Sequence, residues 1–246
     1  MKLLEKLKNK HTCMAIHEPA TIGFFGDSVT NGIFEVYPCL DEEGNFATHD
    51  VCQQSEVYVA HLQRLLNLLY PRAQLNVINA GVSGDNAPNA VTRLDRDLLP
   101  YRPDLTIVCF GLNDMNFGIE KLEAFESALT QIVTRLQSAN SDVILMTPPM
   151  PATYRHRMVP AGEFVQMADR YATLWKDGSV HAYMQAIRSV ASQTGAVLFD
   201  CFEKWERMYL AGVDTTNLLC NLLNHPVREL HPIIAHGLLD IIFQMD

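Results

Sequence analysis

Ser28 is a candidate nucleophile. It lies in the run Gly26-Asp27-Ser28-Val29-Thr30-Asn31-Gly32, directly after an apolar stretch. A serine at a strand-to-helix turn can expose its hydroxyl beside free helix amide groups, where developing negative charge is stabilised. An isolated match of this kind more often marks a helix N-cap. The function of Ser28 therefore depends on what else the chain brings beside it.

Two further segments could donate hydrogen bonds to an oxyanion. The segment Asn79-Ala80-Gly81-Val82-Ser83-Gly84-Asp85-Asn86 has glycines where a backbone amide can approach a ligand closely. The segment Phe110-Gly111-Leu112-Asn113-Asp114 offers the Asn113 side chain, an uncharged donor that does not titrate. Taken alone, the glycine segment is better explained as a tight turn, and the Asn113 segment is equally compatible with a cap or turn.

A general base could come from the C-terminal segment that runs from Asn224 to Pro232 and contains His225 and His231. Pro232 fits the first turn of the helix that follows, so both histidines are expected on or near a loop. An imidazole titrates near neutral pH and can accept the proton of a serine hydroxyl. The helix is predicted from its apolar stripe, Ile234, Leu238, Ile241, Ile242 and Met245.

Alternating apolar and amphipathic segments predict the scaffold. Five apolar runs without polar alternation are typical of strands covered on both faces: 21–25, 75–78, 105–110, 143–146 and 196–199. Helical spacing occurs between them at 56–69, 122–136 and 164–194, with Gly178 as a candidate break. We predict an α/β fold, a three-layer α/β/α sandwich with a flavodoxin-like, doubly wound, parallel five-stranded sheet. Ligands bind beyond the carboxyl ends of such strands, where the candidate segments lie.

Two long segments interrupt this alternation. Residues 34–55 are rich in acidic and polar side chains, and residues 147–162 contain four prolines. We expect both to be loops that shape a pocket, with Pro148, Met150 and Tyr154 as candidate lining residues. No repeat or low-complexity linker divides the chain, so a single domain over 1–246 is expected, with residues 1–19 as an N-terminal extension.

Composition narrows the class of partner. A formal net charge of −9 disfavours nucleic acid and anionic membrane surfaces. No stretch approaches the roughly 20 apolar residues that span a bilayer, and the first 20 residues hold no secretory apolar core, so we expect a cytoplasmic protein without membrane insertion. The six cysteines include no C-x-x-C pair, which favours reduced thiols and argues against a zinc or redox centre.

Taken in chain order, the four segments resemble the SGNH hydrolase superfamily of GDSL-type esterases. The four residues that give the family its letters match Ser28, Gly84, Asn113 and His225. The resemblance implies acyl transfer, in which Ser28 attacks an ester carbonyl and His225 accepts its proton. It also implies an oxyanion hole made of the Ser28 amide, the Gly84 amide and the Asn113 side chain. No cofactor or metal is implied.

One position departs from the family pattern. The aspartate that usually lies three residues before the histidine, and orients it, is Leu222 here. A carbonyl near Leu222, the Asn221 amide or a distant carboxylate such as Asp214 could take its place. We favour a serine–histidine dyad with a carbonyl acceptor, because choosing the tautomer requires only an acceptor.

Three other readings compete with this hypothesis. Ser83 could be the nucleophile of an α/β-hydrolase elbow, but the second glycine of that motif is missing. A flavodoxin-like binding module without activity would leave Asn113 and His225 without roles. A metal site from His225, His231 and His236 has spacings of six and five, which do not place the side chains on one helix face.

The sequence predicts the type of reaction more specifically than it predicts the substrate. The resemblance suggests small O-acyl esters, in particular acetyl groups on carbohydrates, with thioester or lysophospholipid substrates as alternatives. The absence of a long apolar lid segment favours short acyl chains. If His225 is the base, activity should fall as the pH drops through the pKa of His225.

Overall fold

The computed structural model describes residues 2–245 and has a parallel five-stranded sheet at its centre. The strands follow the spatial order β4-β1-β5-β6-β7. Their bounds are β1 (Ala20–Gly26), β4 (Leu75–Gly81), β5 (Leu105–Cys109), β6 (Asp142–Met146) and β7 (Val197–Phe199). Each lies on one of the five predicted runs, and the order confirms the doubly wound α/β fold.

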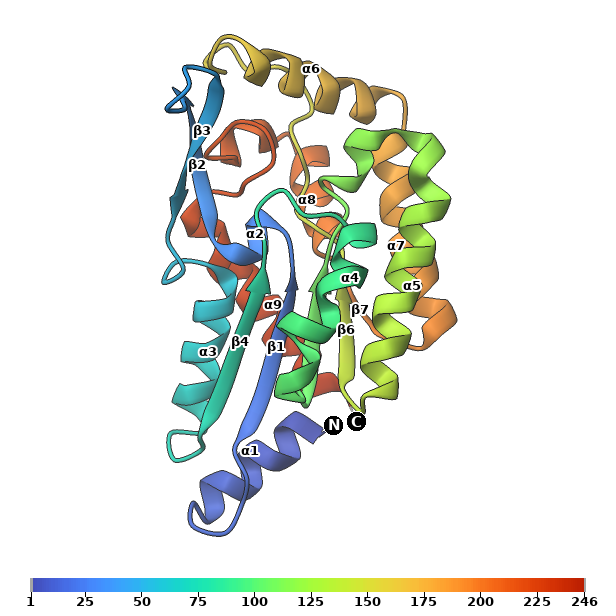
Figure 1. The fold of residues 1–246 in the computed structure, drawn as a ribbon. Coiled ribbons are helices and arrows are strands. Elements are labelled where there is room, and N and C mark those ends of the chain that lie inside the picture. Colours follow the sequence, from blue (N-terminus) through green and yellow to red (C-terminus); the bar gives the residue numbers. More distant parts are fainter. Residues whose placement is uncertain (1, 246) are drawn as a thin grey trace.

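Helices cover both faces of this sheet (Figure 1). On one face α3 (Tyr58–Leu69) packs against α9 (His231–Gln244). On the other, α5 (Leu122–Ser138) packs between α4 (Ala87–Asp97) and α7 (Ser179–Thr194). Their buried stripes meet sheet side chains that are buried on both faces, as expected for parallel strands.

The predicted helical segment 164–194 forms two helices. Helix α6 (Glu163–Lys176) ends before Gly178, and α7 begins directly after it. Gly178 has φ of 82°, a left-handed conformation that glycine adopts without steric cost. The break turns α6 away from the sheet, so that α6 lies above its carboxyl edge (Figure 1).

The N-terminal segment is an integral part of the packing. Helix α1 (Lys2–Thr12) buries Leu3 and Leu7 in the core and contacts β1. One continuous set of buried apolar side chains extends from Leu3 to Ile242. This continuity supports our proposal that the chain forms one domain.

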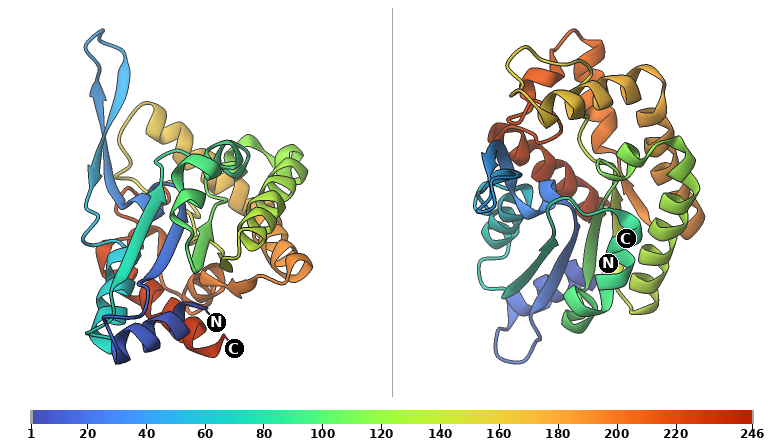
Figure 2. Two further views of the ribbon diagram at one scale, coloured as in Figure 1. Left: turned by 60° about the horizontal axis from the view of Figure 1, so that its bottom comes forward. Right: turned by 45° about the horizontal axis from the view of Figure 1, so that its top comes forward.

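The prediction of a loop at 34–55 was wrong in its local structure. Strands β2 (Ile33–Leu40) and β3 (Phe46–Cys52) form an antiparallel hairpin that projects from the domain (Figure 2). Most of its side chains are partly or fully exposed, including Leu40 at 71%. Its contacts with the rest of the domain are few, such as the Phe46 and Phe164 rings with centroids 6.1 Å apart, so the segment lacks the continuous apolar pattern that reveals a buried strand. Helix α8 (Cys201–Leu210) follows β7.

Candidate active site

Ser28 lies at the turn between β1 and the short helix α2 (Ser28–Asn31). Asp27, rather than Ser28, caps this helix, because its carboxylate accepts from the Val29 amide at 3.0 Å. The Ser28 hydroxyl is therefore not used as a helix cap. A Cβ on Gly81 would lie 2.4 Å from the Asn31 nitrogen, so a glycine at the end of β4 is what lets α2 sit against the sheet.

The structure brings His225 to Ser28 from 197 residues away. Ser28 Oγ and His225 Nε2 are 2.9 Å apart. The other ring nitrogen, Nδ1, lies 2.9 Å from the carbonyl oxygen of Phe34, a residue of β2. Both side chains of the pair are buried, with His225 only 5% exposed.

The Phe34 contact fixes the tautomer of the imidazole. A carbonyl oxygen can only accept a hydrogen bond, so Nδ1 must carry the proton. Nε2 is then left with a lone pair that faces the Ser28 hydroxyl. We expected a backbone carbonyl as the acceptor, and the acceptor is one. It belongs to Phe34 of the hairpin strand β2, however, and not to the loop around Leu222.

The loop that carries His225 is organised by Asn221. Its side-chain oxygen accepts from the backbone amides of Leu223, Asn224 and His225 at 2.9–3.0 Å. Asn221 therefore holds the loop backbone and does not contact the imidazole. The expectation that the Asn221 amide could be the acceptor for His225 Nδ1 was wrong. Leu222 lies at the apex of this turn with φ of 58°.

Electrostatic effects on His225 oppose one another. Burial lowers the pKa of His225 below its usual value, because the charged imidazolium loses water contacts. The hydrogen bond to Phe34 and the negative charge of Asp50 act in the opposite direction. The net effect keeps the imidazole neutral, and so able to accept a proton, to lower pH than an exposed histidine would be.

Gly84 and Asn113 border the same pocket as Ser28. Gly84 has φ of 75°, and a Cβ there would meet nothing within 4 Å, so the glycine is required by backbone conformation and not by crowding. Asn113 Nδ2 donates one hydrogen bond to the Asp85 carbonyl at 2.8 Å. A primary amide has two N–H groups, so the second is left for a ligand.

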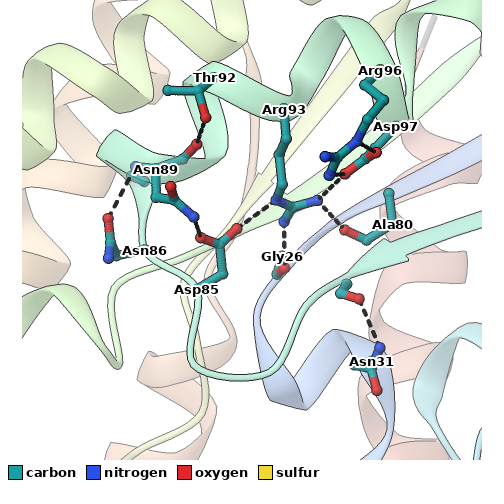
Figure 3. Close-up of polar contacts among 12 residues, drawn as sticks. Gly26, Asn31, Ala80, Asp85, Asn86, Asn89, Thr92, Arg93, Arg96 and Asp97 are labelled. Atoms are coloured by element: carbon teal, nitrogen blue, oxygen red, sulfur yellow. Dashed lines mark hydrogen bonds and ion pairs between the residues drawn. The ribbon is translucent and has the colours of Figure 1, made fainter.

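A buried ion pair supports this edge of the pocket (Figure 3). Arg93 Nε contacts the Asp85 carboxylate at 2.6 Å, and both side chains are almost fully buried. The same guanidinium donates to the Gly26 carbonyl at 3.1 Å and to the Ala80 carbonyl at 2.8 Å. One cation thus joins the carboxyl ends of β1 and β4 to the loop that contains Gly84. Sequence reasoning missed this arrangement, because Asp85 lies in a recognised segment but Arg93 lies outside all four.

Two further carboxyl groups are buried behind the site. Burial raises the pKa of Asp27 to about 7, and likewise that of Asp114 to about 7. Each accepts one backbone amide, from Val29 and from Ala87 respectively, and the second oxygen of each has no partner among residues 2–245. Their role is structural, since both groups fix the loops that follow β1 and β5.

The pocket above Ser28 has a volume of about 170 Å³. Its walls come from the sheet-end loops, the hairpin, α6 and the His225 loop. The lining residues are Ser28, Val36, Thr48, Asp50, Ser83, Gly84, Asn113, Phe164, Met167, Asn221, Leu223, Asn224 and His225. Val36 and Asp50 face each other across the hairpin, and Asp50 accepts from Ser83 Oγ at 3.1 Å.

The segment 147–162 does not line this pocket, which corrects our expectation for Pro148, Met150 and Tyr154. Met150 is fully buried. Tyr154 donates to Asp214 at 2.7 Å, and Asp214 also accepts from Asn217. Asp214 is therefore bound elsewhere and is not the acceptor of His225. The pocket is lined instead by Phe164 and Met167 of α6, where we had expected residues of the segment 147–162.

The competing candidates have other contacts. Ser83 has no histidine partner and hydrogen-bonds Asp50 instead. His231 is buried, where its Nδ1 accepts from the Tyr58 amide at 3.1 Å, and His236 is exposed on α9. Within residues 2–245 no group of three or more His, Cys, Asp or Glu side chains is arranged to hold a metal ion.

The doubly wound sheet and the pocket at its carboxyl edge define an SGNH-type α/β/α protein. The chain belongs to the GDSL-like lipase/acylhydrolase family, whose model matches residues 24–232. This match confirms the resemblance drawn from the four sequence segments.

Individual relatives match over shorter segments. An acetylxylan esterase of Geobacillus stearothermophilus is 30% identical over 134 residues, which cover 51% of this chain and 58% of that protein. An arylesterase of Vibrio mimicus is 29% identical over 90 residues, 37% of this chain and 44% of the relative. The chain thus aligns with less than two thirds of the length of either relative.

Solved structures share the fold over almost the whole chain. An acetyl-xylooligosaccharide esterase from Geobacillus superposes with a TM-score of 0.62 at 22% identity, covering 91% of this chain and 94% of the other. A two-domain esterase active on acetylated mannans gives a TM-score of 0.67 at 17% identity, covering 99% and 53%. In the part of the chain that is described, no helix is both long and apolar enough to cross a membrane.

Proposed function

We propose that this protein is a serine esterase that hydrolyses acetyl esters of carbohydrates. The observation that carries the proposal is the chain of contacts from Ser28 Oγ through His225 to the Phe34 carbonyl, at 2.9 Å for each link. These two contacts place the unprotonated Nε2 of His225 against the Ser28 hydroxyl at the carboxyl edge of the sheet. A serine held in this way can be deprotonated as it attacks.

The reaction has two halves. Ser28 Oγ attacks the ester carbonyl while His225 Nε2 takes its proton, and His225 then gives that proton to the departing alcohol. The acyl group remains on Ser28. His225 next removes a proton from a water that attacks the acyl-enzyme, and returns it to Ser28 Oγ as the acid leaves.

The oxyanion formed in each half would accept hydrogen bonds from three donors. We assign them to the Ser28 amide, the Gly84 amide and the free N–H of Asn113. Amide donors keep their hydrogen-bonding capacity at every pH of interest, and each is typically worth roughly 10²- to 10³-fold in rate. The buried Arg93–Asp85 pair would hold two of these three donors in place.

The small size of the pocket supports a short acyl group, and two polar side chains on its hairpin wall support a polar alcohol. A volume of about 170 Å³ is below the roughly 300 Å³ at which ordinary ligand pockets begin. Asp50 and Thr48 offer acceptors for hydroxyl groups of a leaving alcohol. Asp50 would also repel the phosphates of a lysophospholipid or a coenzyme A thioester. The acetylxylan esterase relative is consistent with this substrate class.

Hydrolysis of p-nitrophenyl acetate, butyrate and octanoate, and acetate release from acetylated xylo-oligosaccharides, would test the proposal. We expect the acetyl substrates to be preferred, with kcat lowered by about 10⁶-fold in Ser28→Ala and by a comparable factor in His225→Ala. Ser192→Ala, on the exposed face of α7, is the matched control. Loss of turnover in Ser83→Ala with retention in Ser28→Ala would refute the assignment.

We also propose a cytoplasmic location. The support comes from the cysteines: all six lie within the described residues, and each is a free thiol. Reduced thiols are the normal state of cysteine in the cytoplasm. Fractionation of the native host with an antibody against the chain would test it, and recovery in a secreted fraction would contradict it.

A further inference from the structure

The hairpin is irregular at the residue that contacts His225. Ile33 of β2 pairs with Cys52 of β3, and Val36 pairs with Asp50. Two residues of β2, Phe34 and Glu35, therefore lie opposite one residue of β3. Such a bulge bends a strand and redirects its backbone groups, and bulges are common beside active sites. Here the Phe34 carbonyl accepts from His225 Nδ1 at 2.9 Å.

One side chain binds both sides of this bulge. Arg228 forms a bidentate ion pair with Glu35, at 2.6 and 2.8 Å. Its guanidinium carbon lies 4.3 Å from the centre of the Phe34 ring, and its Nε donates to Gln53, just after β3. Bidentate arginine–carboxylate pairs fix geometry as well as distance.

Arg228 is also close to His225 along the chain, only three residues later. The two residues project from one short loop, whose bridge between Leu219 and Pro226 limits its movement. Arg228 holds Phe34 and Glu35, while His225 binds the Phe34 carbonyl. The loop and the bulge are thus joined at two points, and either contact restricts the freedom of the other.

We propose that Arg228 and Glu35 are positioning residues that hold the bulged Phe34 carbonyl against His225, and so perform the orienting task of the carboxylate absent at Leu222. This inference rests on the proposed esterase function. It concerns residues that touch neither substrate nor the reacting atoms. Both side chains are about one quarter exposed, at 29% and 25%, so a purely electrostatic contribution would be weakened by solvent.

The charges around His225 make the pH profile informative. The charge of Asp50 from β3 acts on His225, and His225 also interacts with His231, whose pKa burial lowers to about 3, so that His231 stays neutral. The Arg228–Glu35 pair begins three residues along the chain. A direct charge effect of Arg228 could act only one way, because loss of a nearby cation raises the pKa of an imidazole. Losing the Phe34 hydrogen bond would lower it, because that bond favours the imidazolium. The two explanations therefore move the acidic limb of activity in opposite directions.

The test compares Arg228→Met and Glu35→Gln with the wild type. Methionine keeps an apolar stem over Phe34, and glutamine keeps the size of Glu35. We expect kcat to fall about 10- to 100-fold, as for other orienting contacts, with KM and the melting temperature little changed. Arg228→Lys should recover part of the loss, because lysine keeps the charge without the bidentate geometry. The control is Arg207→Met, which removes an exposed ion pair with Glu203 on α8.

Two readouts separate positioning from charge or general destabilisation. In Arg228→Met the acidic limb of kcat/KM should move to lower pH, and the proton NMR signal of His225 Nδ1–H should be lost or shift strongly. An unchanged kcat, or a limb that moves to higher pH with the Nδ1–H signal retained, would overturn the inference. If Ser28→Ala retained activity, the esterase proposal would fail, and the NMR comparison would still decide whether Arg228 holds the carbonyl.

Discussion

The two walls of the pocket are built in different ways. The wall at the sheet edge carries Gly84 and Asn113 on short turns, tied to the strands by the buried Arg93–Asp85 pair. The wall opposite is the hairpin, which projects from the domain and is fastened by the Arg228–Glu35 pair, about one quarter exposed. The first wall is held by the core, and the second by contacts at the surface.

This difference separates the two halves of the chemistry. The donors assigned to the oxyanion are fixed by strand ends and cannot shift without disturbing the sheet. The acceptor that orients the base depends on a bulge in an otherwise exposed hairpin. Perturbations of the first wall should therefore reduce transition-state stabilisation, and perturbations of the second should alter the protonation behaviour of His225.

The largest effect is expected at the sheet-edge wall. Asn113→Ala removes one oxyanion donor and should lower kcat by about 10²- to 10³-fold. The pH dependence should stay the same, because the Asn113 amide does not titrate. Steady-state kinetics on p-nitrophenyl acetate would measure both. Asn217→Ala, which removes an amide from an exposed turn, is the control. A shifted pH profile in Asn113→Ala would break the proposed separation of the walls.

A smaller effect is expected from the hairpin. In the wild type the acidic limb of kcat/KM should lie below the ordinary histidine value of about 6.5, because burial lowers the pKa of His225. Asp50→Asn removes a charge that raises this pKa, so the limb should move to still lower pH, with a modest loss of kcat. A pH–rate series from 4 to 9 would show it, and a limb that moved upward would contradict this assignment of Asp50.

The smallest effect is expected where the family would have its aspartate. Leu222→Asp restores that residue type, and aspartate tolerates the left-handed φ of 58° better than leucine does. We expect no gain in kcat, because the Nδ1 proton is already bound by Phe34. Leu222→Asn serves as the uncharged control. A clear rise in kcat for Leu222→Asp alone would show that the Phe34 carbonyl is a poor substitute.

The same contrast explains what the sequence could predict. Ser28, Gly84 and Asn113 follow buried strands, so the apolar runs and the glycines located them together at one edge. The acceptor at Phe34 is a backbone carbonyl, and every residue has one, so no residue type marks it. Asp50 lies in a hairpin whose side chains are mostly exposed, and the alternation that would reveal its orientation is absent. The fold was predictable from hydrophobic pattern, whereas the hairpin wall required three-dimensional contacts.

The most direct test of the central claim is covalent labelling of the nucleophile. The intact protein would be treated with a fluorophosphonate, digested and analysed by mass spectrometry, with Ser28→Ala and His225→Ala run in parallel. We predict a single adduct on Ser28 in the wild type, none in Ser28→Ala, and strongly slowed labelling in His225→Ala. An adduct on Ser83, or equal labelling of the wild type and His225→Ala, would contradict the account.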